Sequence, residues 1–226
     1  MVFAILIPCL FIFLYCLYKL TKDDYVLIRK NVTVEQMFDM LFIAILLGLF
    51  GARLLYLLLH PIKHHIMIMR FFSPQVVGFS LTGAVITGAV VLYLFSNYRR
   101  IPLGRFLDFV TLSFLITLPI GFAGYSLFFR NDTTLLLLIA ALLYFLLSIF
   151  FLKFLYPRLL NRTLHEGNLT FAFLIYFSLT SLFLDVLQFV KRHIPLLTPE
   201  HIILVCLFLV CLLSLLSQHK FRLRKR

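Results

Sequence analysis

The sequence predicts an all-α integral membrane protein with seven transmembrane helices, and three observations support that fold class. Hydrophobic residues make up 62% of the 226 positions and charged residues only 13%, whereas a soluble domain carries about 25% charged residues. The apolar residues form long runs, and most Lys and Arg residues lie in the short polar segments between those runs. We therefore expect a single transmembrane domain over residues 1–226, which ends in a basic cytoplasmic tail at residues 218–226.

Each apolar run approaches or exceeds the ~20 residues that cross the hydrocarbon core of a bilayer. The predicted spans are residues 2–18, 36–59, 75–96, 106–128, 134–155, 168–190 and 201–217. With the N-terminus outside, the inner segments hold fifteen of the 21 Lys and Arg residues and the outer segments hold five. Cytoplasmic loops carry such an excess, so the pattern predicts an N-out, C-in topology. The net charge of +12 then indicates contact with anionic lipid rather than with nucleic acid.

The first connection and the second span contain two notable polar residues. Thr33 suits the N-cap position of the second span, because its hydroxyl can accept a backbone N–H. Arg53 is the only basic residue well inside any long apolar run. A charge at that depth costs at least a few kcal/mol unless it reaches water or a partner. Two interpretations stay open: Arg53 extends to the outer headgroups, or it belongs to a binding site.

The third span is rich in small residues. Gly78, Gly83 and Gly88 recur at short intervals, with Thr82 and Thr87 between them. Small residues at such spacing let two helices approach closely. We expect close helix packing here, with a groove for a lipid tail as the alternative.

The fourth span begins near Asp108, which we expect to anchor the start of its own helix, where a negative charge is stabilised. The basic residues that could pair with Asp108 are Arg99, Arg100 and Arg105. Near the far end of this span, Pro119, Gly121 and Gly124 predict a kinked or broken helix. A membrane protein tolerates such a break where the freed backbone groups face protein or a cavity.

The last spans contain one deep carboxylate. The fifth span consists mainly of Leu, Ala and Phe, and we expect it to face lipid. Asp185, in the sixth span, lies about five residues from the outer end of its run, and Arg53 lies about six from its own. At about 1.5 Å per residue these depths agree. We therefore hypothesise that Arg53 and Asp185 share an internal polar site in which each offsets the burial cost of the other.

No metal or cofactor site is predicted. His60, His64 and His65 lie in an outer connection, but Pro61 disrupts the helical spacing of His60 and His64, and no carboxylate lies nearby. The four cysteines lie inside apolar runs and form no CxxC pair. They are expected to serve as small apolar side chains.

Four blocks of the sequence resemble motifs of the prolipoprotein diacylglyceryl transferases. Those seven-span bacterial enzymes move a diacylglyceryl group from phosphatidylglycerol to the thiol of a lipobox cysteine. Residues 51–56, GARLLY, resemble the family's Gly-Gly/Ala-Arg-x-x-Tyr, and residues 78–83, GFSLTG, resemble its Gly-Met-Ser-Phe-His-Gly. Asp108 and residues 121–125, GFAGY, keep the spacing of its Asp and its Gly-Arg-x-Gly-Asn signature. The last block, Gly, Tyr, Arg, Glu and Arg, is matched in spacing by Gly167, Phe177, Ser181, Asp185 and Gln188.

The resemblance covers residues 1–217 and implies a fold, a location and partners. It implies the seven-span fold of the family in a bacterial cytoplasmic (inner) membrane. It implies a phosphatidylglycerol-type phospholipid as one partner and a prolipoprotein signal peptide as another, with no cofactor. The residues it assigns to headgroup binding are Arg53, Tyr56, Thr82, Gly83, Gly121, Gly124 and Asp185.

The sequence departs from the family's motifs at positions that carry chemistry. The family's His is Thr82, its signature Arg and Asn are Phe122 and Tyr125, the acidic residue that follows is Arg130, and its last-block Arg residues are Ser181 and Gln188. Binding of an anionic headgroup favours Arg, and thiol activation needs a base or a cationic field. Loss of one positioned acid–base group typically costs ~10²–10⁴-fold in rate.

Three functional readings follow from these matches and departures. The first is a catalytically degenerate relative, a pseudoenzyme that keeps the fold and binds a phospholipid headgroup near Arg53. The second is an active phosphatidylglycerol:prolipoprotein diacylglyceryl transferase with an unrecognised base, for which Asp185, Tyr56 and Thr82 are the candidates. The third is an unrelated small transporter, which the scarcity of intramembrane polar residues and the lack of a repeat between the halves disfavour.

Overall fold

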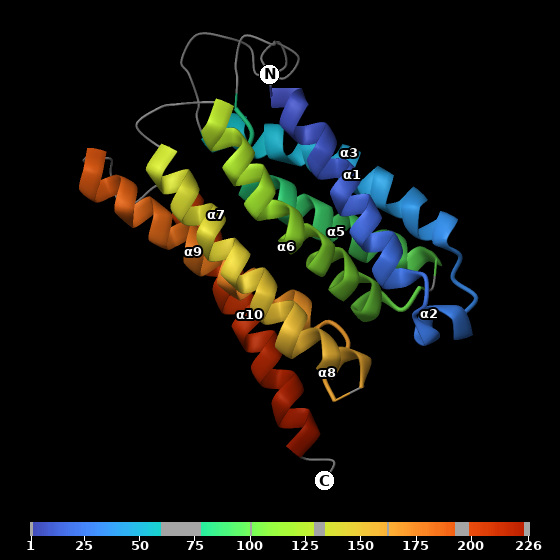
Figure 1. Ribbon diagram of the computed structural model, residues 1–226. Coiled ribbons are helices and arrows are strands. Elements are labelled where there is room, and N and C mark those ends of the chain that lie inside the picture. Colours follow the sequence, from blue (N-terminus) through green and yellow to red (C-terminus); the bar gives the residue numbers. More distant parts are fainter. Residues whose placement is uncertain are drawn as a thin grey trace. The chain divides into compact units, whose positions relative to one another are not determined.

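The computed structural model describes residues 2–59, 78–99, 101–128, 134–161, 163–192 and 199–223 (Figure 1). Every regular element within these ranges is a helix. The chain divides into two compact units. The large unit comprises Met1–Asp24 and Gly104–Arg226, and the small unit comprises Tyr25–Leu103.

The helices follow the apolar runs. The large unit contains α1 (Val2–Thr21), nearly all of α6 (Leu103–Phe128), α7 (Thr134–Phe150), the π-helical turn η1 (Phe151–Leu155), α8 (Tyr156–Leu160), α9 (Asn168–Arg192) and α10 (Pro199–Leu223). The small unit contains α2 (Tyr25–Arg29), α3 (Val34–Leu59) and α5 (Leu81–Arg99). Six helices of the described chain are long and apolar enough to cross a membrane, and Ile5–Thr21 of α1 is a shorter apolar helix. The predicted all-helical membrane fold is confirmed, with six to seven candidate spanning helices in the described chain where the sequence predicted seven.

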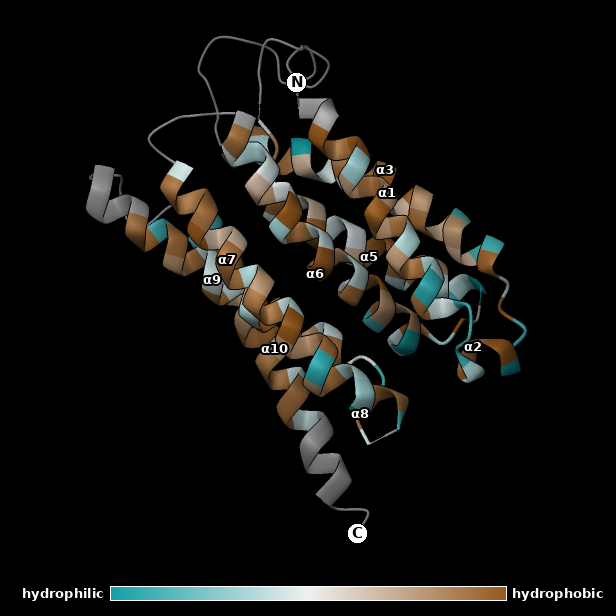
Figure 2. Cartoon of the chain, viewed as in Figure 1, coloured by the Kyte–Doolittle hydropathy of each residue, from teal (hydrophilic) through white to brown (hydrophobic). Residues whose placement is uncertain are grey.

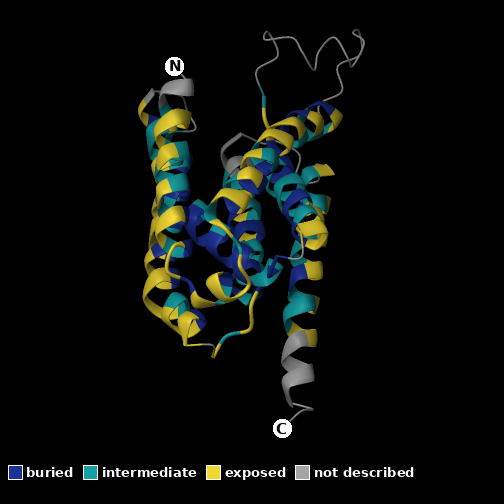
Figure 3. Cartoon of the chain, turned by 90° about the vertical axis from the view of Figure 1, so that its right-hand side faces the viewer, coloured by how far each residue is buried: buried dark blue, intermediate teal, exposed yellow. Residues whose placement is uncertain are grey.

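Apolar side chains cover the outer faces of these helices. Figure 2 shows apolar residues along the length of the helices and polar residues gathered mainly near their ends. Large apolar side chains are exposed along most helices, and Phe11, Leu127 and Leu213 are each at least 64% exposed. In Figure 3, exposed residues run beside buried residues along the helices. Exposed apolar faces of this extent fit a hydrocarbon environment.

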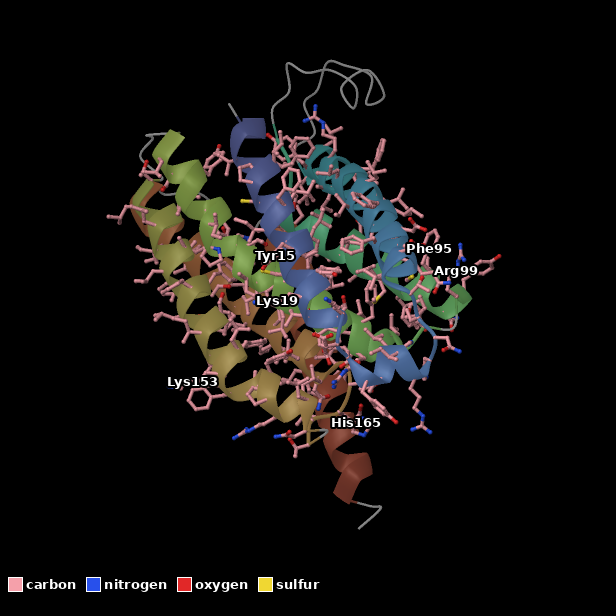
Figure 4. The ribbon with its side chains drawn as sticks, turned by 45° about the vertical axis from the view of Figure 1, so that its right-hand side comes forward. Tyr15, Lys19, Phe95, Arg99, Lys153 and His165 are labelled. Carbon is pink, nitrogen blue, oxygen red and sulfur yellow. The ribbon has the colours of Figure 1, made fainter. Side chains whose placement is uncertain are left out.

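A buried arginine joins three segments at one end of the large unit. Arg105, only 3% exposed, donates from Nε and Nη2 to Asp24 at 3.1 and 2.7 Å. Its Nη1 donates to the Leu159 carbonyl at 2.7 Å. These contacts hold the end of α1, the start of α6 and α8 together, which places predicted inner segments at the same end of the unit. Figure 4 shows Lys153, which is exposed on η1 near this end.

The fifth predicted span exposes apolar side chains on one face, as expected for a helix that faces lipid, and makes polar contacts on the other. Ser148 of α7 lies with its Oγ 2.8 Å from the Leu115 carbonyl and 2.7 Å from the Tyr144 carbonyl. Leu115 is four residues before Pro119, so its carbonyl is the one that Pro119 leaves without a helical donor. The helix α6 is continuous through Pro119. Of the two predicted alternatives, the broken helix is therefore wrong, whereas a kink at Pro119 stays a prediction. A hydroxyl from α7 compensates the proline.

The small unit is built on close packing between α3 and α5. Thr33 and Gln36 form a capping box at the start of α3, which confirms the predicted N-cap. A Cβ added to Gly83 would lie 2.9 Å from the Gly51 carbonyl and 3.1 Å from the Ala52 Cα. The glycines of the third span thus allow the close helix contact that their spacing predicts.

Candidate functional site

Arg53 is buried in the small unit. The residue is 7% exposed on α3, and its Nη1 donates to the Gly78 carbonyl at 3.0 Å. Its guanidinium carbon lies 5.6 Å from the centre of the Phe79 ring, within the range of a cation–π interaction. The segment that precedes α5 therefore contacts the guanidinium and fixes its position.

The other first-half candidates lie around this segment. A Cβ on Gly78 would lie only 2.1 Å from the Tyr56 ring, so Tyr56 packs directly on the backbone beside Arg53. Thr82 is 4% exposed in the first turn of α5, and Gly83 lies one residue further along. The Ser80 hydroxyl accepts the Gly83 N–H at 3.2 Å and caps this helix. The structure thus brings Arg53, Tyr56, Thr82 and Gly83 together at the N-terminus of α5.

Gly121 and Gly124 lie in the large unit, on the face of α6 that meets α1. A Cβ on Gly124 would lie 2.8 Å from Cγ2 of Ile5, and one on Gly121 would lie 3.8 Å from Sγ of Cys9. Helix packing therefore explains Gly124, whereas a Cβ on Gly121 would make only an ordinary van der Waals contact. Their predicted role in headgroup binding stays a prediction.

Asp185 has a partner that the sequence analysis did not name. The Oδ2 of Asp185 on α9 lies 3.4 Å from Nε2 of His201 on α10. The two side chains are 33% and 17% exposed, respectively. Asp185 belongs to the large unit and Arg53 to the small unit, so their shared polar site stays a prediction.

Aromatic and hydroxyl groups occupy positions where the family motif has Arg or Asn. Phe122, at the signature Arg position, stacks on Tyr144 with ring centres 5.6 Å apart and an interplanar angle of 4°. The Tyr144 hydroxyl lies 2.9 Å from the Thr180 hydroxyl. Tyr125 is 40% exposed, and Ser181 is half-buried beside Tyr144. Arg130 and the side chain of Gln188 lie outside the described residues.

Asp108 anchors a helix other than its own, so the prediction that it anchors the start of its own helix is wrong. Its carboxylate accepts the Gly167 N–H at 2.8 Å, and the N–H and hydroxyl of Thr170 at 3.0 and 2.9 Å. These donors belong to the start of α9, where the first N–H groups have no partner within the helix. The carboxylate that ion-pairs with Arg105 is Asp24 instead.

No metal centre emerges from the part of the chain that the structure describes, where no group of three or more His, Cys, Asp or Glu residues could hold an ion. His60, His64 and His65 lie outside that part.

Sequence reasoning missed both ion pairs that the described residues form between different segments, Arg105 with Asp24 and Asp185 with His201. His201 stands at the first predicted residue of the seventh span, and Asp185 stands near the end of the sixth. Consecutive antiparallel helices place such ends side by side, which was the available signal. Asp24 lies in a charged connection with three candidate acids and gave no comparable signal.

Comparisons with known proteins give the family. The chain is 36% identical over 93 residues to a phosphatidylglycerol–prolipoprotein diacylglyceryl transferase of Streptococcus suis (strain 05ZYH33), which covers 41% of this chain and 35% of that protein. It is 30% identical over 93 residues to the transferase of the same description from Streptococcus pneumoniae (strain Hungary19A-6), which covers 41% and 36%. The match thus spans about a third of these relatives. No solved structure matches the chain.

The family model described as prolipoprotein diacylglyceryl transferase matches residues 2–217. This match excludes the third functional interpretation, in which the chain is an unrelated small transporter. A protein with these apolar helices and this match over nearly all of its length is a multi-pass membrane protein, and the chain belongs to the prolipoprotein diacylglyceryl transferase family.

Proposed function

We propose that this chain binds a phosphatidylglycerol-type phospholipid through Arg53. We also propose that it has lost the diacylglyceryl transfer activity that depends on the family's usual polar residues. The observation that carries the proposal is the buried Arg53 guanidinium, fixed 3.0 Å from the Gly78 carbonyl. Its planar fork of N–H donors matches the oxygens of a phosphate. Tyr56, packed against Gly78, lines the same segment.

The proposed loss of transfer rests on what replaces the family's polar residues. Thr82 stands where the family has its His, and Phe122 stacks on Tyr144 where the family has an Arg. A hydroxyl is no base at neutral pH, and a phenyl ring donates no hydrogen bond. Each missing donor typically costs ~10²–10³-fold in rate.

The partners and location follow from the same proposal. The names of the relatives give phosphatidylglycerol and a prolipoprotein as their substrates. We extend these substrate classes to this chain, with the signal peptide of a prolipoprotein as the client segment. The membrane would be the bacterial cytoplasmic (inner) membrane.

The test is lipid retention by the purified protein. Mass analysis of the lipid that remains bound should find phosphatidylglycerol on the wild-type chain and a loss of at least tenfold in Arg53→Leu. Arg99→Leu is the matched control, because Arg99 is exposed at the far end of α5 in the same unit (Figure 4). Equal retention by all three proteins would contradict the proposal.

A second candidate function is an active transferase, and the Asp185–His201 pair favours it. The pair supplies an imidazole, the commonest general base in enzymes, beside a carboxylate. Lipoprotein production in cells depleted of the authentic enzyme separates the two candidates. The degenerate protein would not restore production, whereas restoration by the wild-type chain would establish transfer.

A further inference from the structure

The ring of Phe79 lies over the Arg53 guanidinium and is itself exposed. Its centre is 5.6 Å from the guanidinium carbon. Phe79 is 63% exposed, whereas Arg53 is only 7% exposed. The ring therefore shields the cation from its surroundings on this side of the small unit, and the high exposure of Phe79 means that little packing holds the ring itself.

The backbone on either side of Phe79 is attached to α3. The Gly78 carbonyl accepts the hydrogen bond from Arg53 at 3.0 Å. The Ser80 N–H donates to the Ala52 carbonyl at 3.1 Å. Because the backbone cannot shift without breaking these bonds, the ring moves by rotation about its own side-chain bonds. Exposed side chains rotate in this way on a picosecond to nanosecond timescale.

We propose that the Phe79 ring is a movable cover for Arg53, which competes with a phospholipid phosphate for the guanidinium. This inference rests on the proposed binding of a phospholipid through Arg53, and it adds the residue that regulates that binding. With the ring in place, the electron-rich ring face stabilises the cation. A phosphate offers the same cation a negative charge and oxygen acceptors for its N–H donors. The ring closes the empty site, and the phosphate takes its place once the ring rotates away.

The position of Phe79 suits a lipid that arrives from the outer leaflet. The predicted topology places the start of the third span near the outer headgroups, and Phe79 is the fifth residue of that run. The family motif has Met at this position, and a thioether provides no ring face for a cation. The aromatic cover is therefore a feature in which this chain departs from the motif.

The cover lowers the apparent lipid affinity by a predictable factor. A ligand that binds only the open state has an apparent dissociation constant equal to the intrinsic constant divided by the open fraction. A cation–π contact at an exposed position favours the closed state by a factor of about two to five. Removal of the ring should therefore lower the half-saturating lipid concentration by a factor of about three to six.

The experiment titrates the delipidated full chain in detergent with deuterated phosphatidylglycerol and measures the bound lipid by mass analysis. Phe79→Ala and Phe79→Met should both lower the half-saturating concentration, and Phe79→Tyr, which keeps the ring, should restore the wild-type value. In an Arg53→Leu background, Phe79→Ala should have no effect, because no cation remains to be covered. Phe42→Ala is the matched control and should match the wild type, because Phe42 is 48% exposed on α3, about three turns before Arg53.

The outcomes separate this inference from the proposed function. An unchanged half-saturating concentration in Phe79→Ala, with binding lost in Arg53→Leu, overturns the cover and leaves the proposed function standing. A higher concentration in Phe79→Ala also overturns the cover, because the ring would then support lipid binding. Equal binding by the wild type and Arg53→Leu overturns both. If Phe79→Ala fails to fold, Phe79→Met takes its place, and an unchanged concentration in that variant overturns the inference.

Discussion

At the residue scale, the Asp108 carboxylate supports the fold more than it supports chemistry. Both of its oxygens are engaged by Gly167 and Thr170, and the side chain is fully buried. Gly167 adopts a φ of 92°, which brings its N–H to the carboxylate and favours glycine. The residue that matches the family motif at this position therefore caps the start of α9 in this chain.

Replacement of this carboxylate should destabilise the protein. Asp108→Asn presents an NH₂ group to backbone donors, which leaves buried groups unsatisfied at a cost of about 1–3 kcal/mol each. Thermal unfolding in detergent should show a clearly lower midpoint for Asp108→Asn. Asp23→Asn, at an exposed position, is the control and should leave the midpoint unchanged. Equal midpoints for both variants would show that the cap contributes little.

At the scale of elements, the contact between α3 and α5 depends on one glycine more than on another. A Cβ on Gly83 meets backbone atoms of α3 within 3.1 Å, whereas nothing lies within 4 Å of a Cβ on Gly88. Both residues lie on α5, so their substitutions differ in packing and not in helix propensity.

Gly83→Ala should therefore destabilise the protein by about 1–3 kcal/mol, the usual cost of overpacking. Gly88→Ala should be neutral or stabilise by up to about 1 kcal/mol, because alanine favours a helix. Unfolding in detergent compares the two variants directly. Similar loss of stability in both would mean that α5 does not pack on α3 through Gly83.

The elements also show what the sequence could predict. Apolar runs, caps and small-residue spacing depend on neighbours along the chain, so the spans, the Thr33 cap and the glycine packing were predictable. Partners that lie far apart in sequence were not. The compensation of Pro119 by Ser148, and the pairing of Arg105 with Asp24, arise only once the helices are packed. For the same reason, the sequence did not reveal that the His201 imidazole lies beside Asp185.

At the scale of the whole molecule, the predicted N-out, C-in orientation decides which ends of α9 and α10 face the outside. His165 precedes α9 and Pro199 begins α10, so the two residues lie at opposite ends of this helix pair, and both are exposed. In a chain whose four cysteines are replaced, Pro199→Cys in intact spheroplasts should react with a membrane-impermeant thiol reagent, and His165→Cys should not. The reverse pattern would invert the topology.

The central claim is that Arg53 contacts a phospholipid phosphate. Solid-state NMR dephasing between nitrogen-15 in labelled arginine side chains and phosphorus-31 in retained lipid measures this contact most directly. The account predicts a short nitrogen–phosphorus distance in the wild-type chain that disappears in Arg53→Leu and persists in Arg99→Leu. A wild-type signal that Arg53→Leu leaves unchanged would contradict it.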